Sequence, residues 1–184
     1  MMNIETTAIY MQPLREEHAE ALLRLRLDNR EYMQKYEPVR ADSYWTLETQ
    51  QAMLQQGEQS FLEGTGYVFG IFQSHTGQLI GRIELSGVAR GPFQNASVGY
   101  FVDRQQHGQG YATAALDWVK EYAFREAGLH RLQAGVMPWN KPSQRVLEKV
   151  GFRREGLAER YLCINGKWED HILYAITAEE SMNR

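Results

Sequence analysis

The segment DRQQHGQGYATAAL, residues 103–116, holds two glycines two positions apart between an apolar run and an amphipathic run. Backbone N–H groups at a helix N-terminus are unpaired and carry partial positive charge, and glycine leaves them open to an anion. Gly108 and Gly110 therefore predict a phosphate-binding loop at the start of a helix. A tight strand-to-helix turn without a ligand is the alternative for this pattern alone.

Two common phosphate loops do not fit these residues. The dinucleotide fingerprint GxGxxG requires a glycine where Thr113 stands. A P-loop requires GxxxxGK[ST], and no lysine directly follows Gly110. The pattern that remains is QxxGxG over residues 105–110.

Hydrophobic periodicity predicts the elements that position this loop. Three β-prone runs separated by turn signals predict consecutive antiparallel strands over 66–72, 78–85 and 95–103. An amphipathic helix over about 110–126 follows the loop, and a strand over 132–137 comes next. Strand, helix and strand form a βαβ unit, so strands 95–103 and 132–137 should be parallel.

Other elements are predicted on both sides of this unit. A first strand over 4–12 precedes a helix over 16–27, with a second helix near 47–62. The apolar face of the first helix is expected to hold Ala19, Leu22, Leu23 and Leu27. After the unit come a short helix over 143–150 and a hairpin of strands 152–162 and 168–177. This order predicts an α/β (α+β) fold with a mixed sheet of about seven strands and helices on both faces.

Composition excludes several classes of protein. The chain has 184 residues, 43% of them hydrophobic and 23% charged, as expected for one globular domain. A net charge of −3 argues against a nucleic-acid or membrane-surface binder, and no apolar run is long enough for a membrane helix. The single cysteine, Cys163, fits the cytoplasm. The five scattered histidines include no HExxH motif, so no metal is expected.

A second motif connects the loop to a known family. The loop resembles the [Q/R]xxGx[G/A] pyrophosphate loop of the GNAT superfamily of acyl-CoA-dependent N-acetyltransferases. NKPSQRVLEKVGF, residues 140–152, is similar to the later NxxSxxxLxxxGF motif of that superfamily. RREGLAERYLCINGKWEDHILYAI, residues 153–176, resembles the closing strands of its RimJ/RimL-type branch. The resemblance covers about residues 5–177 and implies a single acetyl-CoA-dependent domain over 1–184, with a GNAT-like, mainly antiparallel sheet whose parallel pair splays apart.

The resemblance also implies which residues contact acetyl-CoA. Loop N–H groups would surround the pyrophosphate, and pantetheine would lie along strand 95–103 as an added strand. The residues expected to bind the cofactor are Tyr100, Phe101, Val102, Gln105, His107, Gly108, Gln109, Gly110, Tyr111, Ala112, Asn140 and Ser143. A helix-capping role for Asn140 and an exposed loop position for His107 are the structural alternatives.

Acyl transfer requires an oxyanion site, an acid for the leaving thiolate and a base for the amine. A backbone N–H within 98–100 is expected to face the thioester carbonyl. Leu147 stands where many relatives have a proton-donating tyrosine, so Ser143 is the expected hydroxyl near the sulfur, with a helix-cap role as its alternative.

The base is less clearly marked in the sequence. Glu84 is the candidate, although strand alternation allows it to face solvent, and a water-relayed base is the default. Glu155, Asp170 and Tyr161 are further candidates from the closing strands.

The resemblance predicts a cytoplasmic monomer or homodimer that acetylates the N-terminal α-amine of a protein, such as a ribosomal protein. A small amine (a polyamine, amino sugar or antibiotic) is the alternative acceptor, and a non-catalytic CoA-binding module is the alternative function. Aromatic and acidic residues in the region 16–63 suit a cationic acceptor, or form a solvated helix face.

Overall fold

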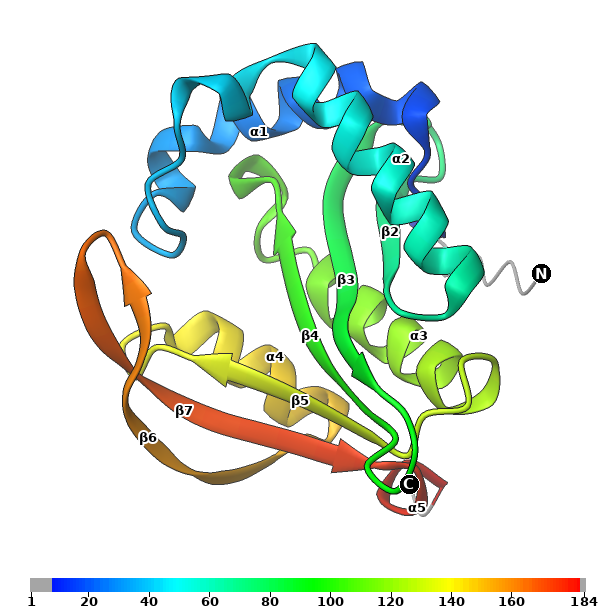
Figure 1. Ribbon diagram of the computed structural model, residues 1–184, viewed down its shortest axis with the longest axis vertical. Helices are drawn as coiled ribbons and strands as arrows, with labels where there is room; N and C mark the ends of the chain where they lie inside the picture. The colour runs from blue at the N-terminus through cyan, green and yellow to red at the C-terminus, as the bar shows by residue number, and fades with distance from the viewer. Residues whose placement is uncertain (1–7, 183–184) are drawn as a thin grey trace.

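The computed structural model describes residues 8–182, which form a seven-stranded sheet with helices on both faces (Figure 1). Across the sheet the strands lie in the order β1 (Ile9–Pro13), β2 (Tyr67–Gln73), β3 (Leu79–Ala89), β4 (Asn95–Val102), β5 (Arg131–Val136), β7 (Lys167–Thr177) and β6 (Arg153–Ile164). Neighbours pair antiparallel except β4 and β5, which are parallel. The predicted mixed sheet is confirmed.

Helices cover both faces of this sheet. They are α1 (Ala19–Met33), α2 (Leu47–Glu63), α3 (Tyr111–Arg125), α4 (Lys141–Val150) and α5 (Ala178–Met182), with 3-10 turns η1 (Glu16–His18), η2 (Asp42–Trp45) and η3 (Arg104–Gln106). The helices α1 and α2 form one core with Phe72 and Leu79 of the sheet. The helices α3 and α4 pack on the opposite face, over the larger core.

Local signals explain why these elements begin and end where they do. Ala115, Leu116 and Val119 of α3 are fully buried, which is the apolar face that the sequence predicts. Asn140 caps α4 by accepting the N–H of Ser143, and α4 ends at Val150 with Gly151 as its C-cap. Asn165 and Gly166 have φ values of +53° and +79°, as a two-residue hairpin turn of type I′ requires.

The helix predicted over 16–27 differs from α1 in its buried face. Leu27 is 45% exposed, whereas Leu25, Arg26 and Asn29 are buried. The buried stripe of α1 continues through the polar residues Arg26 and Asn29. The prediction from apolar spacing therefore ended the helix too early and was wrong in placing Leu27 on the buried face. Residues 4–7 of the predicted first strand lie outside the described residues.

The parallel strands β4 and β5 separate after a short paired stretch. Pairing is limited to Asn95 with Arg131, Ala96 with Leu132 and Ser97 with Gln133. Beyond these positions the two strands diverge, and Figure 1 shows the opening between them. This confirms the splayed parallel pair. Within residues 8–182 no helix combines the length and apolar content that crossing a membrane requires.

Candidate functional site

The loop between β4 and α3 presents a row of unpaired backbone N–H groups. Gly108 and Gly110 have φ values of +81° and +83°, and a Cβ at either position would have open space around it. Within residues 8–182 no acceptor pairs with the N–H groups of residues 108–113. Because α3 begins at Tyr111, these groups lie at its positively polarised N-terminus. The loop therefore has the geometry of an anion site.

Side chains from α1 and from the loop itself hold this loop in place. The side chain of Asn29 donates to Asp103 Oδ1 (3.3 Å) and accepts the N–H of Arg104 (3.0 Å). His107 is exposed, yet its Nε2 donates to the Val102 carbonyl at 3.0 Å, which fixes the proton on that nitrogen. His107 thus ties the loop to the end of β4. Gln105 and Gln109 are exposed.

Strand alternation shows which amides of β4 face the opening. The N–H of Asp103 donates to the Ile80 carbonyl, so the amides of Phe101 and Gly99 also point toward β3. The main-chain groups of Val98, Tyr100 and Val102 therefore face the gap beside β5. Phe101 directs its main chain to β3, and its side chain lines a cavity on the α1 side of the sheet.

A cavity of about 240 Å³ occupies the gap between the splayed strands. Its walls come from β4, β5 and the start of α4, and include Asn140, Ser143 and Leu147. Leu147 is fully buried, and its apolar side chain supplies no proton donor to this wall. Asn140 and Ser143, from the NxxSxxxLxxxGF motif, thus line the same cavity as the residues of β4.

Tyr100 supplies a hydroxyl group that the sequence analysis did not identify. Its phenol oxygen lies 3.0 Å from Ser143 Oγ, joining β4 to the first turn of α4. Burial raises the pKa of Tyr100 to about 12, and the hydrogen bond with Ser143 opposes this rise. The phenol therefore stays protonated at neutral pH. Alternation along β4 alone could not reveal a partner on α4.

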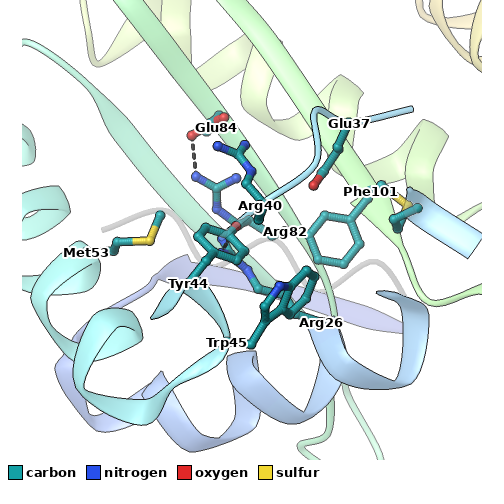
Figure 2. A pocket seen from close by; sticks show the side chains of 10 residues that line it. Arg26, Glu37, Arg40, Tyr44, Trp45, Met53, Arg82, Glu84 and Phe101 are labelled. Carbon is teal, nitrogen blue, oxygen red and sulfur yellow. Dashed lines mark hydrogen bonds and ion pairs between the residues drawn. The ribbon is translucent and has the colours of Figure 1, made fainter. Parts of the chain in front are cut away.

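A second cavity of about 260 Å³ opens on the α1 side of the sheet (Figure 2). It is lined by Arg26, Met33, Glu37, Arg40, Tyr44, Trp45, Met53, Arg82, Glu84 and Phe101. The residues that line both cavities are Met33, Glu37, Arg82, Glu84 and Phe101. The two cavities thus meet at a shared wall.

Glu84 lies on this shared wall and is not simply a solvent-facing side chain. Its carboxylate forms an ion pair with Arg82, drawn in Figure 2. Its side chain also lies beside the strand opposite, since a Cβ built at Gly99 would be 3.8 Å from Glu84 Oε1. The carboxylate is therefore next to the part of β4 that borders the gap.

The other base candidates lie outside both cavities. Glu155 forms a bidentate pair with Arg131, whose hydrogen bond lowers the pKa of this carboxyl below its usual value. Asp170 accepts the N–H of Arg160, a residue with φ of +51° at a bulge of β6. Tyr161 is 41% exposed. These contacts explain both carboxylates as structural groups.

His171 was not identified from the sequence and lines the gap cavity. It is 4% exposed, and its Nδ1 donates to the Glu169 carbonyl at 3.0 Å. Because a carbonyl oxygen can only accept, Nδ1 carries a proton. Within residues 8–182 no three His, Cys, Asp or Glu side chains are arranged to hold a metal ion.

The arrangement suits transfer between two molecules that meet at the sheet. An anionic ligand can bind at the loop and extend through the gap, and a second molecule can enter from the α1 side. Tyr100 and Ser143 supply hydroxyl groups to the gap cavity, and Glu37 and Glu84 supply carboxylates to the wall that both cavities share.

Comparison with known proteins agrees with this geometry. A family model described as an acetyltransferase (GNAT) domain matches residues 9–153. The chain is 43% identical to the Bacillus subtilis protein named "Probable N-acetyltransferase YjcK" over 91% of this chain and 93% of that protein. It is 35% identical to the Escherichia coli [ribosomal protein uS5]-alanine N-acetyltransferase over 83% of this chain and 79% of that protein.

A solved structure extends the agreement to three dimensions. RimJ of Mycobacterium smegmatis, in complex with CoA-disulfide, superimposes with a TM-score of 0.88. The two sequences are 34% identical, and the match covers 94% of this chain and 83% of RimJ.

Proposed function

Because this chain belongs to the GNAT family and is an N-acetyltransferase, we propose that it transfers the acetyl group of acetyl-CoA to the N-terminal α-amine of a protein, such as a ribosomal protein. The observation that carries the proposal is the meeting of the two cavities at Glu84 and Arg82. A thioester in the gap and an amine on the α1 side would face each other there. The ribosomal acceptor is supported by the identity with the uS5-alanine enzyme.

Acetyl-CoA fits the loop and the gap. The unpaired N–H groups of residues 108–113 match a pyrophosphate, which needs many donors. The peptide-like pantetheine would bond to the main chain of Tyr100 and to the N–H of Val102, since these groups face the opening and the Val102 carbonyl already accepts from His107. Asn140 lines the same opening and can add its side-chain N–H, because its oxygen is used in capping α4.

The chain's own groups would then carry the transfer. Glu84, directly or through water, takes a proton from the amine, whose nitrogen attacks the thioester carbonyl carbon. An N–H of Val98 or Tyr100 stabilises the oxyanion, as amides pointing into the gap can do. The carbon–sulfur bond breaks, and Ser143, supported by Tyr100, donates a proton to the thiolate. Tyr100 thus offers a hydroxyl that Leu147 lacks, which argues against a non-catalytic module.

The acceptor is tested by measuring CoA release with a matched panel. The panel holds peptides with a free N-terminal alanine, the same peptides with a blocked N-terminus and an internal lysine, and then spermidine and an aminoglycoside. We expect turnover on the free α-amine and none on the blocked peptides. Turnover on spermidine or the aminoglycoside alone would instead assign a small-molecule acceptor.

A further inference from the structure

The cavity on the α1 side contains a buried cation that forms no ion pair with the residues the structure describes. Arg26 is 8% exposed, and within residues 8–182 it forms no ion pair. Among residues 8–182 the one side-chain hydrogen bond of Arg26 is to the hydroxyl of Tyr44, and its guanidinium also lies 4.9 Å from the centre of that ring. Burial lowers the pKa of Arg26, and the more distant charges of Glu37 and Glu84 offset this only in part. A buried charge of this kind is costly unless something pairs with it.

A second guanidinium lines the same cavity. Arg40 is exposed, also lies 4.9 Å from the Tyr44 ring centre, and forms no ion pair with any residue from 8 to 182. Figure 2 shows Arg26, Arg40 and Arg82 gathered around one space with Glu37 and Glu84. Glu84 is already paired with Arg82. The two remaining arginines therefore lack a carboxylate within 4.0 Å.

The charge and donor balance of the cavity favours an anion. Three arginines against two glutamates leave one positive charge in excess. The indole N–H of Trp45, which also lines this cavity, is buried and has no acceptor among residues 8–182. A purely cationic acceptor such as a polyamine would meet this excess with repulsion.

We infer that this cavity binds a carboxylate that the acceptor carries close to its amine, with Arg26 and Arg40 as its ligands. The inference rests on the proposed N-acetyltransferase function and specifies its substrate class. Arginine suits this role because its planar group donates two parallel hydrogen bonds to a carboxylate. The acceptor's amine would lie toward Glu84, and its carboxylate would lie toward Arg26. An acidic side chain next to a protein N-terminus and the carboxylate of a free amino acid share this chemistry.

The first test compares acceptors that differ only in that charge. Ala-Asp and Ala-Asn peptides of otherwise identical sequence form one arm, and free alanine and alaninamide form the other. We expect a KM for the Ala-Asp peptide at least about 30-fold lower than for Ala-Asn. Turnover of alanine but not alaninamide, with no peptide acetylated, would support the carboxylate site while refuting a protein acceptor. Equal KM values within both arms would overturn the inference even if the peptides are good substrates.

The second test assigns the selectivity to the two arginines. Arg26→Gln and Arg40→Gln should raise KM for the Ala-Asp peptide to that of Ala-Asn while leaving kcat within a few fold. Arg26→Lys should restore only part of the selectivity, because an ammonium cannot bind a carboxylate through two parallel bonds. Arg24→Gln, an exposed position on the same helix, is the matched control and should change nothing.

Binding measured without turnover separates a ligand role from a structural one. Calorimetry with CoA present should show tighter binding of Ala-Asp than of Ala-Asn peptide, and Arg40→Gln should remove the difference. Arg40 is exposed, so this variant keeps the test valid even if Arg26→Gln does not fold. Unchanged selectivity in Arg40→Gln, and in any folded Arg26 variant, would overturn the inference.

Discussion

The phenol oxygen of Tyr100 lies 3.0 Å from Ser143 Oγ, so a hydroxyl on the splayed strand meets a hydroxyl on the first turn of α4. If the pair acts as one proton-donating unit, Tyr100→Phe and Ser143→Ala should each lower kcat about 10- to 100-fold. The double variant should lose little more than either single variant, because coupled groups are not additive. Initial rates at saturating acetyl-CoA measure all three.

The matched control for this cycle is Tyr122→Phe. Burial raises the pKa of Tyr122 to about 12 as well, but this residue packs on α3 against Trp118 and Tyr67. The Tyr122→Phe variant should therefore have the kcat of the wild type. Losses that multiply in the double variant would show that Tyr100 and Ser143 act separately.

The two carboxylates on the shared wall should differ in their effect on the rate. Glu84→Gln should lower kcat by about 100-fold or more, because the amine loses its proton acceptor. Glu37→Gln removes the other carboxylate of both cavities and should change mainly KM for the acceptor. Steady-state kinetics with a free-amine peptide measures both. A larger kcat loss for Glu37→Gln would move the base to Glu37.

The glycines of the loop should act on acetyl-CoA binding rather than on folding alone. Gly110 and Gly128 both have positive φ (+83° and +62°) and open space around a built Cβ. Alanine at either should therefore cost about 1 kcal/mol of unfolding free energy. Only Gly110→Ala places a methyl group among the unpaired N–H groups, so only it should weaken acetyl-CoA, by about 10-fold or more. Denaturant unfolding measures the stability of each variant, and calorimetry measures its affinity for acetyl-CoA. If Gly110→Ala and Gly128→Ala bound acetyl-CoA equally well, the assignment of this loop as the binding site would be contradicted.

The pair of Glu155 with Arg131 should make stability depend on pH in acid. The hydrogen bond from Arg131 lowers the pKa of Glu155 in the folded chain below its ordinary value of 4.5. The stabilisation is therefore fully present above that value and is lost as the pH falls through the lower, folded pKa. Glu155→Gln should be less stable than wild type at neutral pH, and the difference should shrink as the pH falls below 4.5.

Denaturant unfolding at a series of pH values measures this difference. Glu159→Gln, at an exposed position of the same strand, is the control and should follow the wild-type curve. A gap between wild type and Glu155→Gln that stays constant into acid would show that the carboxylate charge does not contribute.

Much of the fold could be predicted because its signals are local. The glycines at 108 and 110, the cap at Asn140 and the Asn165-Gly166 turn each depend on a few adjacent residues. Local patterns also located the loop and the second motif. The splay of β4 from β5 came from the family resemblance, since no local residue marks where pairing ends.

The rest of the site depends on contacts between distant segments. The buried polar residues Arg26 and Asn29 interrupt the apolar stripe of α1. For this reason, apolar spacing alone predicted that Leu27 lies on the buried face. The contact of Tyr100 with Ser143 joins residues 43 positions apart. His171 was one of five scattered histidines, and only the path of β7 brings it to the gap cavity. No spacing in the chain marks such pairs.

The central claim is tested most directly by locating the transferred acetyl group. A synthetic peptide with a free N-terminal alanine, an aspartate at the second position and an internal lysine is incubated with the protein and acetyl-CoA, then sequenced by mass spectrometry. The account predicts one acetyl group on the α-amine and none on the lysine. Binding of acetyl-CoA with the α-amine left unmodified would contradict it.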